Sequence, residues 1–307
     1  MAFLTTIEDI RKHISQLSTG VKFSDIEGDV RTAQREFIET YFGSSFPDAA
    51  SITIKELLKE ALSNFAVYRF SMKNPVQLTA SGMQSVSNDN FQAAAKYDKF
   101  NFRDMLLATG YSALEAALHL SIQDEDFKDT PQYKSATARL LNFTVEIDSY
   151  KLDFETFQPL KKHIALIERQ MLKPILGALY DELFEKQYVT ENGLNALKTE
   201  LLGLVRDALG QYAIELAFEQ NLIQISGQQV SIRTLKDADA RYQTAAPSLD
   251  LYTLAMKTKA DYSARYFYAL NDFLTQNATA LGWVPPASSV VSSSNPTEQI
   301  GIKTLGK

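Results

Sequence analysis

The three histidines are the side chains that could act as acid–base catalysts or metal ligands near neutral pH. His13, His119 and His163 are isolated from one another, and each falls within a predicted helix. None is followed four residues later by a second histidine or a carboxylate, so the chain lacks the His-Glu-x-x-His arrangement of zinc enzymes. The spacing favours positions on a helix surface or at the edge of a core, and it predicts no metal site.

Two groups of carboxylates could also support chemistry. Asp237 and Asp239 could form an acid–base couple, but a spacing of two places them on different faces of a helix. The run Asp124-Glu125-Asp126 is typical of a solvated boundary rather than a metal site. The chain has no cysteine, its 13 glycines are dispersed, and it contains no Gly-x-Ser-x-Gly motif. We therefore predict no catalytic residues, no cofactor and no enzymatic activity.

Arginines next to aromatic residues could stack on the bases of single-stranded nucleic acid. Arg241-Tyr242 is one such pair, and the stretch from Tyr262 to Tyr268 surrounds Arg265 with aromatic residues. At helical spacing, such residues more often fill a core or a subunit contact. A structural role is therefore the favoured interpretation.

The helix that organises the chain occurs twice, because residues 23–43 match residues 157–177 at a constant shift of 134. The apolar positions recur every three or four residues, and each copy ends at a glycine, which readily adopts the left-handed conformation. Matched residues are Phe23 and Phe157, Ile26 and Leu160, Val30 and Ile164, Arg35 and Arg169, Phe37 and Met171, Tyr41 and Ile175, Phe42 and Leu176, and Gly43 and Gly177. We expect the shared arginine to form a structural ion pair at the centre of each unit. Pro174 stands where the first copy has Thr40, so it predicts a kink in the second copy alone.

The segments after each copy also repeat. Apolar helices are predicted over 57–72 and 201–218, and alternating segments interrupted by Ser-Gly predict β-hairpins over 76–86 and 222–232. A closing helix follows each hairpin, and a short strand is predicted over 143–147. We interpret this order as an internal duplication. The predicted fold is mainly α, with two duplicated helical domains over 1–130 and 131–282, each with a small β-hairpin, and an extended C-terminal tail over 283–307.

That tail differs from both domains in composition. It begins Trp283-Val284-Pro285-Pro286 and continues with a serine-rich stretch, which is typical of an extended segment without a core of its own. Apolar residues along it are candidates for binding a partner protein: Trp283, Pro285, Pro286, Val290, Val291, Ile300, Ile302 and Leu305. We predict a docking tail that becomes ordered upon assembly.

The overall composition is that of a folded protein. The 307 residues suffice for two domains, and 45% of them are hydrophobic. A net charge of −6 argues against a surface built to grip nucleic acid by neutralising phosphates. We find no signal peptide and no apolar stretch long enough to cross a bilayer, so we expect a soluble protein made inside the cell, with no membrane partner.

The opening of the chain resembles the head–tail connector (adaptor) proteins of tailed bacteriophages. The resemblance lies in a capped first helix over 4–12, an acidic-apolar entry over 23–26, a helix over 33–43 with an aromatic-Gly end, and the helix around 65–70. In the capped helix, Thr5 with Glu8 and Thr6 with Asp9 are alternative capping pairs. The second copy, over 157–177, is similar to uncharacterised phage and prophage structural proteins of Bacteroidota.

This resemblance implies a structural protein in the neck of a virion, made in the host cytoplasm. It would form a ring, of twelve copies, beneath the portal protein, extend the DNA channel and dock the tail or a neck protein. DNA would pass through the lumen without specific binding, and the C-terminal segment would contact the portal. Family members usually have one such domain, whereas this chain is predicted to have two. The alternative is a DNA-binding or DNA-packaging factor.

Overall fold

The computed structural model describes residues 3–286 apart from 16, 18, 74–75, 80–81, 86–91, 150, 192 and 220–248. The fold is mainly α, as predicted, and no helix among the described residues is both long and apolar enough to cross a membrane. In chain order the elements are α1 (Ile7–His13), α2 (Phe23–Ala33), η1 (Gln34–Ile38), α3 (Glu39–Phe42), α4 (Phe46–Ala49), α5 (Ile52–Lys73), β1 (Val76–Thr79), β2 (Gly82–Ser85), α6 (Gln92–Ser121), α7 (Glu125–Lys128), α8 (Pro131–Ala136), η3 (Thr144–Glu146), α9 (Phe154–Ile167), η4 (Glu168–Leu172), α10 (Lys173–Leu176), α11 (Ala178–Lys186), α12 (Ala196–Glu219), α13 (Leu249–Gln276) and α14 (Ala278–Leu281).

Helix α2 continues through η1 into α3 as one long rod. Ile26, Val30, Ile38 and Phe42 of its apolar stripe are buried, and Phe23, Phe37 and Tyr41 are half-buried against the same core. The segment η1 is a π-helix, in which hydrogen bonds span five residues instead of four. The rod ends at Gly43, whose φ of 74° lies in the left-handed region that favours glycine.

The rod formed by α9, η4 and α10 has the same construction 134 residues later. Its π-helix η4 corresponds to η1 residue for residue at that shift, and it ends at Gly177 with φ 56°. The π segment is not peculiar to the copy that contains Pro174, because it occurs also in the first rod, where Thr40 stands instead. In the second rod this shift in the backbone hydrogen-bond pattern comes just before Pro174, a residue that has no N–H to donate.

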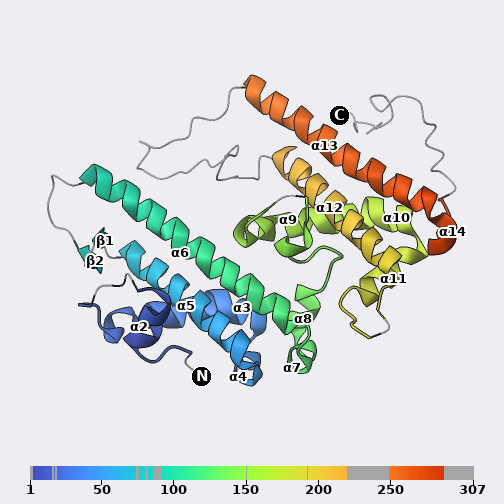
Figure 1. Cartoon of the computed structure of the whole chain (residues 1–307). Helices are drawn as coiled ribbons and strands as arrows, with labels where there is room; N and C mark the ends of the chain where they lie inside the picture. Colours follow the sequence, from blue (N-terminus) through green and yellow to red (C-terminus); the bar gives the residue numbers. More distant parts are fainter. Residues whose placement is uncertain are drawn as a thin grey trace, which may run out of the picture.

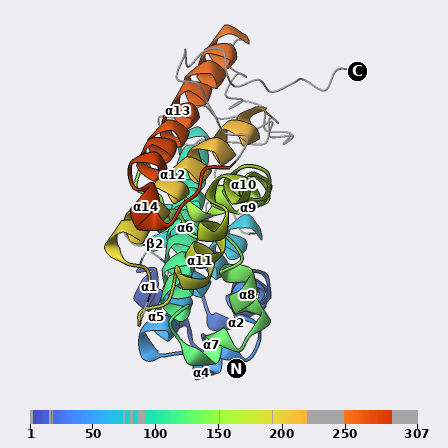
Figure 2. The ribbon, with the colours of Figure 1, turned by 90° about the vertical axis from the view of Figure 1, so that its right-hand side faces the viewer.

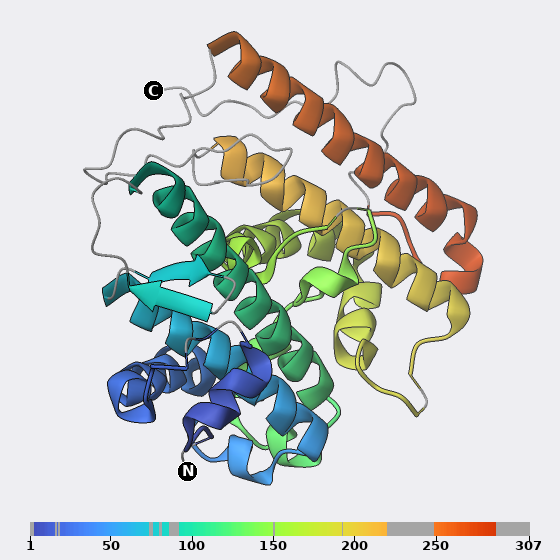
Figure 3. The same ribbon diagram turned by 60° about the vertical axis from the view of Figure 1, so that its left-hand side comes forward.

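Two pairs of long helices dominate the molecule. Helix α5 packs along α6, and α12 packs along α13, while the two rods pack against α5 and α12 respectively. Figures 1 and 3 show α6 and α13 running in similar directions. In Figure 2 the N-terminal helices lie at one end of the molecule and α13 lies at the other.

A two-stranded antiparallel sheet connects α5 and α6. Val76 of β1 lies opposite Ser85 of β2, and Thr79 lies opposite Gly82. This sheet occupies the position of the first predicted hairpin. The second predicted hairpin, over 222–232, lies outside the described residues, as do Asp237, Asp239 and Arg241-Tyr242.

The first half of the chain, from α1 to α8, and the second half, from η3 to α14, share one continuous hydrophobic core. Phe154, at the start of α9, packs against Tyr41 and Tyr111, with ring centroids 5.7 Å and 6.3 Å apart. Helix α8 packs on α3, so the residues just after 130 lie with the first half. The halves therefore meet through an apolar contact and through the segment that follows α8.

Candidate functional site

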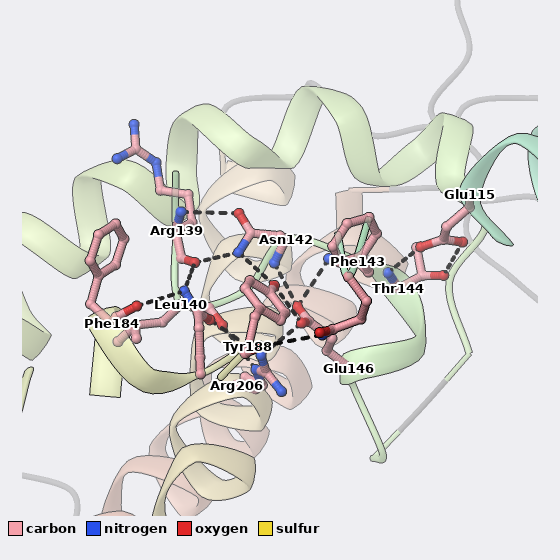
Figure 4. A network of polar contacts seen from close by, with 12 residues as sticks. Glu115, Arg139, Leu140, Asn142, Phe143, Thr144, Glu146, Phe184, Tyr188 and Arg206 are labelled. Atoms are coloured by element: carbon pink, nitrogen blue, oxygen red, sulfur yellow. Dashed lines mark hydrogen bonds and ion pairs between the residues drawn. The ribbon is translucent and has the colours of Figure 1, made fainter. Parts of the chain in front are cut away.

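The segment over 139–147 joins the two halves and carries a dense set of buried polar contacts (Figure 4). The strand predicted over 143–147 is wrong, because Thr144–Glu146 form the short 3₁₀ helix η3. Glu146 reaches back to the N–H groups at the start of this turn, which satisfies them locally instead of through a neighbouring strand. We call the cluster around this turn the polar junction; its members are Glu115, Arg139, Leu140, Asn142, Phe143, Thr144, Glu146, Gln187, Tyr188 and Arg206.

The carboxylate of Glu146 is the centre of the polar junction. One oxygen, Oε2, accepts hydrogen bonds from the N–H groups of Asn142 at 2.7 Å and Phe143 at 3.1 Å. The other, Oε1, accepts from the Tyr188 hydroxyl at 2.7 Å and from Nη2 of Arg206 at 2.7 Å. Four donors thus compensate a carboxylate whose side chain is 4% exposed.

Arg206 connects the junction to α12. Its Nε donates to the carbonyl oxygen of Leu140 at 2.9 Å, and its guanidinium lies 5.9 Å from the ring centroid of Tyr188. Burial and the negative charge of Glu146 raise the pKa of the Tyr188 hydroxyl well above its ordinary value. Tyr188 therefore remains protonated and acts as a hydrogen-bond donor at physiological pH.

Glu115 brings α6 of the first half to the same junction. Its carboxylate accepts hydrogen bonds from both the N–H and the hydroxyl of Thr144, the latter at 2.7 Å. Burial raises the pKa of Glu115, although the two hydrogen bonds from Thr144 oppose that shift. This contact ties the connecting turn to the long helix that carries the first half.

Lys161 of α9 lies close to these carboxylates. Burial lowers the pKa of Lys161 to about 8, against the opposing attraction of Glu115 and Glu146. Its Nζ lies 5.6 Å from the ring centroids of both Phe154 and Phe157, within the range of cation–π attraction. Lys161 therefore supplies a half-buried positive charge near the two carboxylates.

The geometry of the polar junction suits a structural joint. A general base needs a carboxylate oxygen free to take a proton from a substrate, whereas both oxygens of Glu146 are occupied by protein donors. A groove of about 790 Å³ opens beside the junction, and Gln187 and Tyr188 line it. The Tyr188 hydroxyl is nevertheless bonded to Glu146. No group of three or more potential metal ligands occurs among the described residues.

Residues 29–137, about a third of the chain, are similar to a family described as "Family of unknown function (DUF6712)". The matched segment runs from within α2 to the residue after α8. No curated protein and no solved structure matches the chain.

The structure describes three of the eight predicted partner-binding residues. Trp283 is 7% exposed, and its Nε1 donates a 2.8 Å hydrogen bond to the carbonyl oxygen of Ile175. A docking role for the Trp283 side chain is therefore corrected, because the side chain is buried in the core of its own chain. Pro285 and Pro286 follow it at the surface and at partial burial. Val290, Val291, Ile300, Ile302 and Leu305 lie outside the described residues.

The structure also shows the burial of the two matched arginines and of the three histidines. Arg35 and Arg169 are both exposed, so the ion pair expected at the centre of each unit is wrong. His163 is 4% exposed within α9, and His119 lies edge-on to the ring of Phe143 at 5.2 Å. His13 is half-buried. The exposed His119 and the half-buried His13 agree with the predicted helix-surface or core-edge positions, whereas His163 is buried in the core instead.

Sequence reasoning missed the residues of the polar junction. Glu115, Glu146 and Arg206 come from separate elements, so no local spacing relates them. The one signal available was Glu146, three residues after Phe143, which is the spacing of a capping box. The β-branched and aromatic residues around it favoured a strand instead.

Proposed function

We propose that this protein is a non-enzymatic connector in the neck of a tailed phage, located between capsid and tail. In this proposal it forms a ring beneath the portal, extends the DNA channel and docks the tail. The observation that carries the proposal is the way in which the N-terminal part of the chain, the part that resembles connectors, is folded. The residues that resemble connectors form α1, the first rod and α5, which pack together as one bundle.

The capped first helix of that resemblance has the expected form. Of the two alternative capping pairs, Thr6 and Asp9 make the reciprocal hydrogen bonds of a capping box. The apolar residues Ile10 and Ile14 of this helical region are buried against the bundle. An ordered opening helix is a feature that the proposal requires.

We also propose that the second half arose by duplication of the first. The support is the pair of rods, each with a π segment at the same shift of 134 and each ending at a glycine with positive φ. π segments are rare, so two at matching positions are better explained by common descent than by chance. The order of rod, long helix and closing helix is also the same in both halves.

The polar junction and the shared core support a single rigid building block. Buried charges that are fully hydrogen-bonded fix the relative position of the elements that carry them. A ring subunit needs such rigidity, because small errors in subunit geometry accumulate around a closed ring.

In this proposal the docking tail begins after Pro286. Trp283, held by Ile175, fixes the point from which the tail leaves the second half. Val290, Val291, Ile300, Ile302 and Leu305 remain the proposed contacts to the portal. Apolar residues on a polar segment lose conformational freedom upon docking, so these contacts would form only in the assembly.

The test is a truncation after Pro286, which keeps Trp283 and removes residues 287–307. We expect the truncated protein to fold with unchanged helix content and unfolding temperature, and to be missing from particles assembled in its presence. The matched control is full-length protein with Val284→Ala, which changes an apolar residue that is 80% exposed and leaves the tail intact. Normal incorporation of the truncated protein would remove the docking role of the tail.

A further inference from the structure

A second hollow, separate from the polar junction, lies over the second rod. It encloses about 490 Å³ and is bordered by α9, η4, α10 and α11. Four cationic side chains line it: Arg139, Lys162, Arg169 and Lys173. Glu168 and Tyr180 also line it, together with Ala165 and Leu166. We call this hollow the basic groove.

The charge of the basic groove is opposite to that of the chain. The chain carries a net charge of −6, yet four cations converge on this one hollow. Lys173 forms an ion pair with Asp181 at 3.2 Å. The Asp181 side chain is 61% exposed, so solvent screens this pair. Within the described part of the chain, neither Lys162 nor Arg169 has a carboxylate partner at ion-pair distance. The groove therefore has positive charge that the described protein groups do not neutralise.

The carboxyl group of Glu168 lies buried beneath these cations. The residue is 2% exposed, and its Oε1 accepts a 2.6 Å hydrogen bond from the N–H of Leu140. Its Oε2 is buried and has no hydrogen-bond partner among the described residues; the nearest cation is Nε of Arg139, at 3.8 Å. Burial raises the pKa of Glu168 to about 7. Near neutral pH this carboxyl group is therefore only partly ionised, which limits the negative charge beneath the four cations.

The polar junction holds one side of the groove in place. The N–H of Arg139 donates to Oδ1 of Asn142 at 3.0 Å, and its carbonyl oxygen accepts from Nε2 of Gln187 at 2.9 Å. Figure 4 shows the Arg139 side chain directed away from the junction. Its guanidinium is thus presented to the groove from a fixed backbone.

We propose that the basic groove binds phosphate groups. Arginine and lysine are the usual partners of phosphate, since arginine bonds two oxygens at once and lysine supplies a compact charge. The volume suits one or two phosphate groups with their attached sugar.

The source of the phosphate is either a nucleic-acid backbone or a small phosphate ester. Contacts of this kind are independent of base sequence, so they are compatible with DNA that passes the protein without specific binding. The inference does not rest on the connector role, because it depends only on the side chains that line the groove.

The first rod provides a matched control for the experiment. Arg35 is the counterpart of Arg169, and both are exposed arginines in a π segment. The counterparts of Lys162 and Lys173 are Gly28 and Glu39, so the first rod has no equivalent cluster of cations. Arg35→Glu and Arg169→Glu change the net charge by the same amount, and only the second alters the basic groove.

The experiment measures binding of the full chain to a short DNA duplex by fluorescence anisotropy and to inorganic phosphate by calorimetry. We expect Arg169→Glu and Lys162→Glu each to weaken binding by about tenfold, as the loss of a charged hydrogen bond does. Arg35→Glu is expected to change it by less than about twofold, as an exposed charge outside the site does. The slope of log affinity against log salt for the duplex should fall by about one for each groove variant.

Three outcomes decide the proposal. Binding of both ligands with this pattern assigns the groove to a nucleic-acid backbone, and binding of inorganic phosphate alone assigns it to a small phosphate ester. Equal losses in Arg35→Glu and Arg169→Glu would overturn the proposal, because affinity would then follow net charge. Absence of binding to both probes by the wild-type chain would overturn it as well. Circular dichroism of each variant establishes that it is folded.

Discussion

The guanidinium of Arg206 and the carboxylate of Glu146 form a 2.7 Å ion pair, with side chains that are 16% and 4% exposed. The pair ties α12 of the second half to the turn that connects the halves. Because Glu146 also accepts hydrogen bonds from Asn142, Phe143 and Tyr188, the ion pair belongs to a network that both halves share.

Replacement of Arg206 by Met should be strongly destabilising. The substitution keeps most of the side-chain volume but leaves the Glu146 carboxylate buried without its cation, which costs about 3–5 kcal/mol. Urea unfolding followed by circular dichroism measures the effect. The control is Arg31→Met, which removes an ion pair to Glu27 whose side chains are 73% and 47% exposed, and which should cost less than about 1 kcal/mol. Similar losses for both variants would contradict the role assigned to the junction.

Glu168→Gln should stabilise the protein relative to wild type as the pH rises. The pKa of Glu168 is raised from 4.5 to about 7, so the native state holds a proton that the unfolded chain releases between those values. Wild-type stability attributable to this group is therefore present at low pH and is lost as the pH rises towards 7. Glutamine retains the acceptor for the N–H of Leu140 and does not ionise.

We expect the difference in unfolding free energy between Glu168→Gln and wild type to shift by about 2 kcal/mol in favour of the variant between pH 5 and pH 8. Denaturant unfolding at both pH values measures it. Glu125→Gln, at a side chain that is 84% exposed, should leave stability nearly unchanged at both. A difference that does not vary with pH for Glu168→Gln would argue against a buried carboxyl group of this kind.

Trp283→Ala should release the end of the chain from the second half. It removes the hydrogen bond to the carbonyl oxygen of Ile175 and a buried ring, a loss of about 3 kcal/mol. Limited proteolysis should then cleave near residue 283 faster than in wild type. Trp283 is the single tryptophan, so its fluorescence should be that of a buried indole and should shift to longer wavelength on unfolding. Unchanged proteolysis in Trp283→Ala would mean that this contact does not hold the chain end.

Two glycines in the interiors of long helices should respond to alanine in opposite ways. A Cβ at Gly110 in α6 would lie 2.8 Å from the ring of Phe65, so Gly110→Ala should destabilise by about 1–3 kcal/mol. A Cβ at Gly203 in α12 meets nothing within 4 Å, so Gly203→Ala should stabilise by up to about 1 kcal/mol through helix propensity. Thermal unfolding of the two variants gives the comparison. The close packing of α5 on α6 would be contradicted if Gly110→Ala were neutral.

Local periodicity predicted the parts of the fold that depend on one helix face. The stripe through Ile26, Val30 and Phe42 is buried as expected, and so is the stripe through Phe157, Leu160 and Ile164. The matching glycines, Gly43 and Gly177, end their rods with positive φ. These features follow from short-range geometry, which a sequence records directly.

Features that depend on long-range contacts were not predictable in the same way. Pro174 was the only irregularity expected in the rods, whereas each rod contains a π segment. The strand expected over 143–147 is a 3₁₀ turn, because Glu146 caps it from within. Trp283 was assigned to a partner, but the carbonyl oxygen that it bonds lies 108 residues earlier. The cations of the basic groove likewise come from positions between 139 and 173, and spacing alone does not show that they converge.

The most direct test of the connector role is an electron cryomicroscopy reconstruction of the neck of a particle that contains this protein. The proposal predicts a closed ring of this chain between the portal and the tail, with residues 287–307 lying against the portal. Location of the chain elsewhere in the particle, or density for it only as a single copy, would contradict the proposal.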